Sequence, residues 1–132
     1  MSGNAVYLDT SAFMKLVMPE PESVPLRAHL RQWRVRVSAT LLCTEALRTA
    51  ARASPTRLQS VKRQLRGLVL INLDRDLLLR AGTLVPPDLR SLDAIHLAAA
   101  LSIGDELGEL LTYDTRMAVA ARAHGIIVAS PA

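Results

Sequence analysis

The sequence predicts a single α/β domain with a parallel sheet of about five strands and helices on both faces of the sheet. Three observations favour this fold class. Short runs rich in Val, Ile and Leu alternate with longer segments of helical periodicity, as they do where helices connect parallel strands. The 132 residues fit one domain. No repeat, linker or low-complexity tract divides the chain, so the domain is expected to span residues 1–132.

The expected strands are segments of four or five residues with a high content of Val, Ile and Leu. Continuous apolar runs of this length are typical of strands that are buried on both faces of a sheet. Because a helical segment separates each strand from the next, neighbouring strands are expected to be parallel. The five segments are residues 5–9, 35–38, 69–73, 110–113 and 126–129.

Segments with helical periodicity fill the intervals between these strands. Asp74 and Ser91 are expected to be the N-caps of two of the helices, and Gly125 follows the last one. In an open parallel sheet of this kind, ligands bind beyond the carboxyl ends of the strands, where the strand order reverses. The expected helices cover residues 11–18, 25–34, 39–53, 55–67, 74–82, 91–103 and 114–124.

The composition limits both the core and the partners of this domain. Half of the residues are hydrophobic but only 3% are aromatic, so Ala, Leu, Val and Ile must form most of the core. The net charge is +4, and only two of the 16 basic residues are Lys. An Arg-rich surface suits the phosphate groups of nucleic acids, and a GC-rich genome is a second explanation for the same enrichment.

No segment of the sequence indicates export or insertion into a membrane. The first residues contain neither the basic stretch nor the apolar run of a signal peptide. No apolar stretch has the length that a transmembrane helix needs. Cys43 is the only cysteine, so a disulfide within the chain is impossible. We therefore expect a cytoplasmic protein without a membrane partner.

Four of the twelve acidic residues lie in contexts where a charge is costly. Asp9 and Asp114 each follow an expected apolar strand at the edge of the sheet where ligands bind. Asp93 lies in the first turn of an apolar helix, and Glu45 lies inside another one. Charges among apolar neighbours are unfavourable unless they are paired or bind a cation. The other eight lie in polar loops, turns or helix starts.

Each of these carboxylates also has an ordinary structural explanation. The three aspartates can favour the N-terminus of a helix, and Glu45 can pair with Arg48 or Arg52 on its own helix. The expected fold nevertheless brings at least Asp9 and Asp114 into one crevice. Carboxylates a few ångströms apart repel by a few kcal/mol unless one is protonated or a divalent cation neutralises them. Ligands that are all oxygen select a hard ion such as Mg²⁺ or Mn²⁺.

Four sequence motifs place these residues in a known context. They are YLDTSAFMKL near the start, TEAL at residues 44–47, and then SLDAIHLAAAL and LLTYDTRM. In this order the motifs resemble the PIN domain, and most closely the toxin nuclease of VapBC-type toxin–antitoxin pairs, over residues 4–128. The resemblance implies that the whole chain is one PIN domain, a Rossmann-like three-layer sandwich.

The resemblance also implies a composition for the site. Asp9, Glu45, Asp93 and Asp114 are implied as the catalytic carboxylates. The three aspartates among them are implied as ligands of Mg²⁺, with Mn²⁺ as an alternative ion.

Two further positions match supporting residues of the family. Ser11 matches a small polar residue that supports Asp9, and Thr112 matches the family's T-x-D step. The chain departs from the family at one place, because several PIN domains carry another acidic residue shortly after the last Asp. Here that stretch is Thr115, Arg116 and Met117. This departure leaves open whether one or two metal ions bind, and it makes Arg116 either a phosphate contact or an ordinary surface residue.

The implied activity is that of a metal-dependent endoribonuclease, which acts as the toxin of a type II toxin–antitoxin system. A metal ion activates water for such hydrolysis, and Glu45 or Asp114 is expected to orient or deprotonate that water. The products would carry a 5′-phosphate and a 3′-hydroxyl. The implied partners are RNA, a cognate antitoxin and a second copy of the chain in a homodimer. The helices expected at residues 39–53 and 55–67 are candidates for the antitoxin groove.

Other interpretations have less support in the sequence. His96 stands one helical turn after Asp93, and it is expected to pack in the core rather than to bind metal. A receiver-like domain needs a late Lys, and a D-x-D phosphatase needs a second Asp where Ser11 stands. A PIN-fold binding module with little or no activity is the alternative that stays open. The basic residues expected to contact an RNA backbone are Arg48, Arg52, Arg57, Lys62, Arg63, Arg66 and Arg90.

Overall fold

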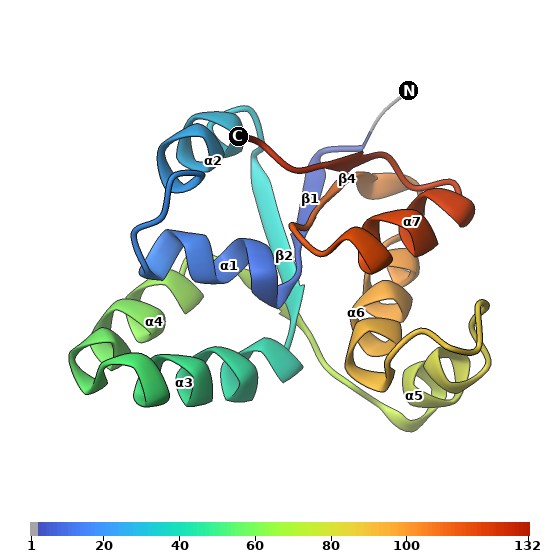
Figure 1. Cartoon of the computed structure of the whole chain (residues 1–132). Helices are drawn as coiled ribbons and strands as arrows, with labels where there is room; N and C mark the ends of the chain where they lie inside the picture. Colours follow the sequence, from blue (N-terminus) through green and yellow to red (C-terminus); the bar gives the residue numbers. More distant parts are fainter. Residues whose placement is uncertain (1–2) are drawn as a thin grey trace.

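The computed structural model of the chain describes residues 3–132 (Figure 1). Residues 1 and 2, the start of the expected 1–132 domain, lie outside the described residues. Five strands form one sheet, in which every neighbouring pair is parallel. They are arranged in the order β3-β2-β1-β4-β5. The strands are β1 (Ala5–Leu8), β2 (Val35–Ala39), β3 (Val69–Ile71), β4 (Leu107–Leu111) and β5 (Val128–Ala129).

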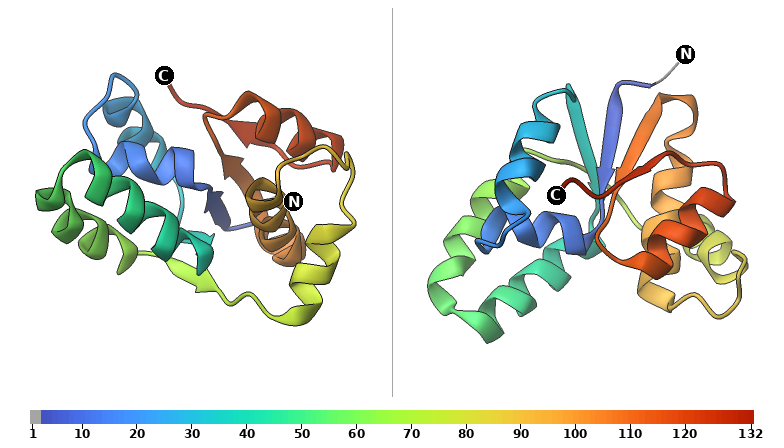
Figure 2. Two further views of the ribbon diagram at one scale, coloured as in Figure 1. Left: turned by 60° about the horizontal axis from the view of Figure 1, so that its bottom comes forward. Right: turned by 45° about the horizontal axis from the view of Figure 1, so that its top comes forward.

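Helices cover both faces of this sheet. Helices α1 and α2 lie on one face, with α3 and α4 packed beside α1, and α5, α6 and α7 lie on the other (Figures 1 and 2). The expected three-layer α/β sandwich is therefore confirmed. The helices are α1 (Thr10–Val17), α2 (Ser23–Leu30), α3 (Leu41–Ala53), α4 (Leu58–Leu65), α5 (Arg75–Gly82), α6 (Ser91–Ser102) and α7 (Thr115–Ala123).

The central strand β1 shows how the sequence fills both layers. All four of its residues are buried, and successive side chains of a strand point to opposite faces. Val6 and Leu8 pack against α1 and α2, whereas Ala5 and Tyr7 pack in the cluster that contains α5, α6 and α7. Alanines of α6 and α7 supply much of that second cluster, so the helices approach the sheet closely without aromatic side chains.

The strand order determines where the site lies. The chain adds β2 and then β3 on one side of β1, and it adds β4 and β5 on the other side. The order therefore reverses between β1 and β4, whose carboxyl ends open the crevice in which parallel sheets bind ligands. Asp9 directly follows β1, and Asp114 lies three residues beyond the end of β4.

Several expected boundaries were wrong. Strand β4 begins at Leu107, so Glu109 lies within the strand and not in a loop before it. This acidic residue is accommodated there because its Oε1 lies 2.5 Å from Nε2 of His29 on α2. Ser91 is the first residue of α6 and not its N-cap, since Arg90 takes that position without a side-chain cap. The predicted cap at Asp74 is confirmed, because its Oδ1 accepts from the amide of Leu77 at 2.9 Å.

Several expected helices also differ in their bounds. Strand β2 continues to Ala39, whose partner is Ile71 of β3, and α3 therefore begins later than expected. Helix α2 begins at Ser23 and ends at Leu30. After Leu30, backbone amides donate to the carbonyl three residues earlier, as in a turn, and not four residues earlier, as in an α-helix. The segment 55–67 divides into a single 3-10 turn and α4. Within residues 3–132, no helix combines the length and the apolar character needed to cross a membrane.

Candidate active site

Asp9 directly follows β1, at the edge of the sheet where the strand order reverses, and is 3% exposed. Its Oδ1 accepts hydrogen bonds from the amide of Ala12 at 3.0 Å, which caps α1, and from the hydroxyl of Ser11 at 2.6 Å. Its Oδ2 accepts from the hydroxyl of Thr112 at 2.5 Å. Burial raises the pKa of this carboxyl, and the hydrogen bonds from Ser11 and Thr112 oppose that effect. Ser11, which the resemblance implied as a support of Asp9, therefore contacts its carboxylate, and so does Thr112 of the T-x-D step.

Asp114 is joined to Asp9 through the same threonine. The hydroxyl oxygen of Thr112 accepts from the amide of Asp114 at 3.1 Å while its proton goes to Asp9. Oδ1 of Asp114 caps α7 by accepting from the amides of Arg116 at 2.9 Å and Met117 at 3.3 Å. Asp9 and Asp114 are thus helix caps and members of the crevice at once, so the two explanations do not exclude each other. The side chain of Arg116 stays exposed.

The side chain of Arg90 connects Asp93 to Asp114. Arg90, the residue before α6, donates from Nε to Oδ2 of Asp93 at 3.0 Å, and its Nη2 lies 2.9 Å from the same oxygen. That Nη2 also donates to Oδ2 of Asp114 at 2.6 Å. The bond to Asp93 and the charges of both aspartates raise the pKa of Arg90. Arg90, which was expected to contact the RNA backbone, therefore lies between two of the acidic side chains.

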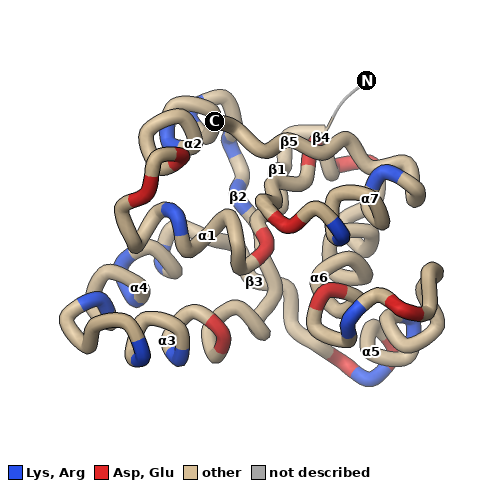
Figure 3. Tube along the Cα trace, in the orientation of Figure 1, with Lys and Arg blue, Asp and Glu red and all other residues tan. Residues whose placement is uncertain are grey.

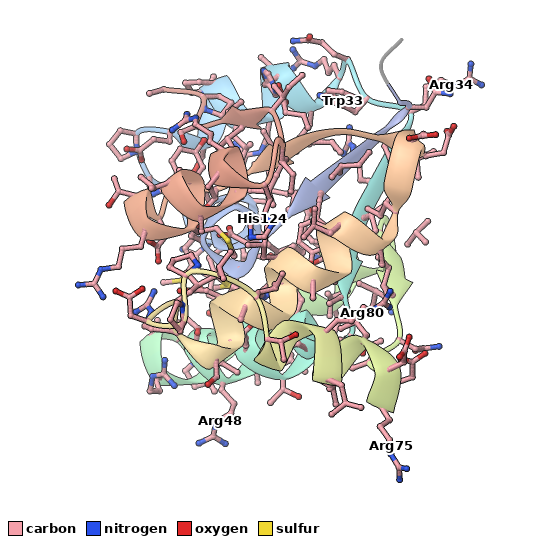
Figure 4. The ribbon with its side chains drawn as sticks, turned by 90° about the vertical axis from the view of Figure 1, so that its right-hand side faces the viewer. Trp33, Arg34, Arg48, Arg75, Arg80 and His124 are labelled. Atoms are coloured by element: carbon pink, nitrogen blue, oxygen red, sulfur yellow. The ribbon has the colours of Figure 1, made fainter. Side chains whose placement is uncertain are left out.

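Glu45 contacts a different set of partners. Its Oε1 accepts from the hydroxyl of Thr10 at 2.5 Å and lies 2.8 Å from Nε2 of His96. Burial would raise the pKa of Glu45, but the hydrogen bonds from His96 and Thr10 outweigh it and the pKa is lowered. Pairing with Arg48 or Arg52, the simpler explanation of this residue, is wrong, because neither forms an ion pair with Glu45 among residues 3–132. Figure 4 shows Arg48 pointing away from the protein.

His96 was expected to pack in the core, and it does so while bonding to the site. Its side chain is 2% exposed, and Nδ1 lies 2.7 Å from the hydroxyl of Tyr7, which is fully buried. A carboxylate can only accept, so in the neutral imidazole Nε2 carries the proton and Nδ1 accepts from Tyr7. A continuous series of hydrogen bonds thus joins β1 to Glu45. A polar residue one turn after Asp93 in an otherwise apolar helix was the signal for this role.

The four carboxylates therefore form two adjoining groups. Asp9, Asp93 and Asp114 are connected through Thr112 and Arg90, and Glu45 is held by Thr10, the residue after Asp9. Figure 3 shows acidic positions at the adjoining ends of α1, α6 and α7 and on α3. As the side chains stand, no three His, Cys, Asp or Glu groups among residues 3–132 gather closely enough to hold a metal ion.

Known proteins resemble this chain over nearly its whole length. The PIN domain model matches residues 6–123. Ribonuclease VapC46 of Mycobacterium tuberculosis is 44% identical over 127 residues, which cover 96% of this chain and 98% of the relative. Ribonuclease VapC47 of the same species is 40% identical over 131 residues, 96% of each chain. The chain belongs to the VapC group of the PIN-domain family. The resemblance inferred from the four motifs is thus confirmed.

Solved structures show the same fold at lower sequence identity. VapC20 of Mycobacterium tuberculosis, described as a toxin that cleaves the sarcin–ricin loop, has a TM-score of 0.73 and 16% identity over 87% of this chain and 94% of its own. A toxin–antitoxin complex from Klebsiella pneumoniae has a TM-score of 0.71 and 22% identity, with coverage of 96% and 98%. VapBC2 of Rickettsia felis, bound to a promoter DNA fragment, has a TM-score of 0.69 and 13% identity, with coverage of 97% and 99%.

Proposed function

We propose that this protein is a metal-dependent endoribonuclease and the toxin of a type II toxin–antitoxin system. The observation that carries the proposal is that Thr112 and Arg90 connect Asp9, Asp93 and Asp114 beside the point where the strand order reverses. These residues come from three separate elements, and two of them share one cation, the guanidinium of Arg90. The relatives named ribonucleases, 44% and 40% identical to this chain, support the same activity.

The residues present fit a Mg²⁺ or Mn²⁺ ion. The donors are carboxylate oxygens, which such hard ions prefer, and Mg²⁺ is commonly held by only one or two carboxylates together with waters. Asp9 already accepts three hydrogen bonds, so roughly one of its four lone-pair sites is free for a metal. Asp93 and Asp114 each direct Oδ2 at a position that a cationic group already occupies. We infer that the three aspartates hold the ion.

The chain's own side chains have separate roles in this proposal. A bound divalent ion would lower the pKa of a coordinated water and neutralise charge on the phosphate. Ser11 and Thr112 hold the buried Asp9 in one orientation, since both of its oxygens accept from them. Glu45 has a lowered pKa and is therefore anionic at neutral pH, as an acceptor for the proton of the attacking water must be. In-line attack would leave a 5′-phosphate and a 3′-hydroxyl.

The RNA backbone would bind on the basic surface beside the crevice. Figure 3 shows basic positions along α3 and α4. Two of the expected contacts have other partners, since Arg90 binds Asp93 and Asp114 and Arg57 donates to the carbonyl of Val17 at 3.1 Å. The remaining expected contacts are exposed, as is Arg116, which we retain as a candidate phosphate contact. They are Arg48, Arg52, Lys62, Arg63 and Arg66.

A cognate antitoxin is the second partner that we infer. A groove of about 480 Å³ lies between α3 and α4, where the sequence placed the docking surface. Its lining combines apolar side chains with basic ones, which suits an amphipathic helix that carries acidic residues. We infer a homodimer from the family resemblance. The lining residues are Leu47, Arg48, Ala51, Arg52, Leu58 and Lys62.

Cleavage of labelled structured and single-stranded RNAs by the purified protein tests the proposed activity. We expect cleavage with Mg²⁺ or Mn²⁺ and none with EDTA. Asp9→Asn should abolish the activity, because it removes a metal ligand while keeping the size of the side chain. Asp105→Asn is the matched control, since it removes the same charge from the exposed turn before β4.

Two results would contradict the proposal. Cleavage that continues in EDTA or in Asp9→Asn would show that the acidic crevice is not the active site. No cleavage of any RNA, with Mg²⁺ failing to raise the melting temperature, would favour the alternative of a PIN-fold binding module.

A further inference from the structure

Arg90 is the one basic side chain that binds directly to two of the inferred metal ligands among residues 3–132. Its Nη2 lies 2.9 Å from Oδ2 of Asp93 and 2.6 Å from Oδ2 of Asp114. These aspartates are 21 residues apart in sequence: Asp93 lies in α6, and Asp114 is the N-cap of α7 in the same layer. A single nitrogen therefore bridges two carboxylate oxygens that would otherwise face each other without a counter-ion.

A metal ion and this guanidinium cannot use the two oxygens together. Mg²⁺ binds carboxylate oxygens at about 2.0–2.1 Å and demands near-octahedral geometry around itself. A metal between the same Oδ2 atoms would lie against Nη2, so two cationic centres would compete for one space and for the same lone pairs. Binding of the metal through both aspartates thus requires Arg90 to move away.

The surroundings of Arg90 allow that movement. Its side chain is 62% exposed, although the side chains of Asp93 and Asp114 are 17% and 23% exposed. Within residues 3–132 its guanidinium makes hydrogen bonds only to these two aspartates. Rotation of the side chain into solvent would break those bonds and no others, and the aspartates would stay where helix α6 and the cap of α7 hold them.

We propose that Arg90 is a built-in competitor of the metal ion: it neutralises Asp93 and Asp114 in the metal-free protein and is displaced when the ion binds. The inference rests on the proposed metal-dependent function. A protein whose binding-competent state is populated to a fraction f binds its ligand with an affinity lowered by that fraction. If Arg90 bridges the aspartates about nine-tenths of the time, it weakens metal binding about tenfold.

Titration of the full chain with Mn²⁺ alone tests this competition. The EPR signal of free Mn²⁺ gives the affinity of wild-type protein, Arg90→Met and Arg116→Met at constant ionic strength. Methionine keeps a long unbranched side chain but has no charge. We expect Arg90→Met to bind Mn²⁺ about tenfold more tightly than wild type. Arg116→Met, which removes an exposed charge from α7 without removing the bridge, should change the affinity much less.

The melting temperature provides a readout that does not depend on RNA cleavage. In EDTA, Arg90→Met should melt below wild type, because Asp93 and Asp114 then face each other without a counter-ion. Mn²⁺ should raise the melting temperature of Arg90→Met more than that of wild type. Arg116→Met should resemble wild type in both conditions.

The possible results separate this inference from the proposed function. Equal Mn²⁺ affinity in wild type and Arg90→Met would overturn the competition while leaving the metal site intact. Weaker binding in Arg90→Met would overturn it as well, since Arg90 would then support the metal ligands. Absence of Mn²⁺ binding in both proteins would overturn the competition together with the metal-dependent function.

Discussion

Tyr7→Phe tests whether the buried hydrogen bonds between β1 and Glu45 position that carboxylate. The substitution removes only the hydroxyl that donates to Nδ1 of His96 at 2.7 Å, and the aromatic ring keeps its packing. Tyr7 is fully buried and His96 is 2% exposed, so water does not readily replace the lost partner. Leaving a buried polar atom without a partner costs about 1–3 kcal/mol, which is the loss of unfolding free energy we expect.

The same substitution should alter the site itself. Without the hydroxyl, Nδ1 of His96 loses its donor, and the ring that donates from Nε2 to Glu45 is no longer held from its other side. Loss of a partner that orients a residue of a metal site typically lowers activity about 10–100-fold, and we expect RNA cleavage to fall within this range. Urea unfolding measures the stability, and the ¹⁵N NMR shift of Nδ1 reports whether this nitrogen has lost its hydrogen bond.

Tyr113→Phe is the matched control for this experiment. Its hydroxyl donates to the backbone carbonyl of Pro131 at 2.6 Å, and within residues 3–132 it makes no hydrogen bond to a side chain of the site. It should lower stability modestly and leave cleavage per folded molecule unchanged. The reasoning is refuted if Tyr7→Phe keeps the wild-type unfolding free energy, ¹⁵N shifts and cleavage rate.

Two further predictions follow from the carboxylates. Asp9→Asn should increase the free energy of unfolding in EDTA by about 0.5–2 kcal/mol, the usual gain when a costly functional residue is replaced. Burial raises the pKa of Asp9, so folding is unfavourable for its charged form at neutral pH. An Asp9→Asn variant that is less stable than wild type in urea unfolding would contradict this prediction. Glu45 has a pKa below its usual 4.5, so its stabilising contribution is present above that pH and lost as the pH falls through the folded-state value. Glu45→Gln should therefore lose less stability than wild type on acidification below pH 4.5, and parallel pH profiles in thermal melts would contradict the assignment.

The fold and the place of the site could be predicted because they depend on local patterns. Alternation of apolar runs with helical segments indicated the parallel sheet, and a parallel sheet brings the ends of β1 and β4 together. Asp9 and Asp114 follow those strands, so their meeting needed no knowledge of side-chain positions.

The contacts that complete the site could not be predicted in this way. Arg90 was expected to contact the RNA backbone. Its neighbours in the sequence do not show that the chain before α6 brings it beside Asp114. The partner of Glu45 was sought on its own helix, whereas it is His96, which lies 51 residues away on α6. Both contacts join residues far apart in sequence, which become neighbours only after the helices have packed on the sheet.

Anomalous X-ray diffraction from crystals soaked in Mn²⁺ tests the central claim most directly, because it locates the ion by its own scattering. The account predicts a Mn²⁺ peak that contacts carboxylate oxygens of Asp9, Asp93 and Asp114, with the guanidinium of Arg90 moved away from Oδ2 of both Asp93 and Asp114. A peak bound only by other residues, or no peak in the crevice at millimolar Mn²⁺, would contradict the assignment of these carboxylates as a metal-dependent active site.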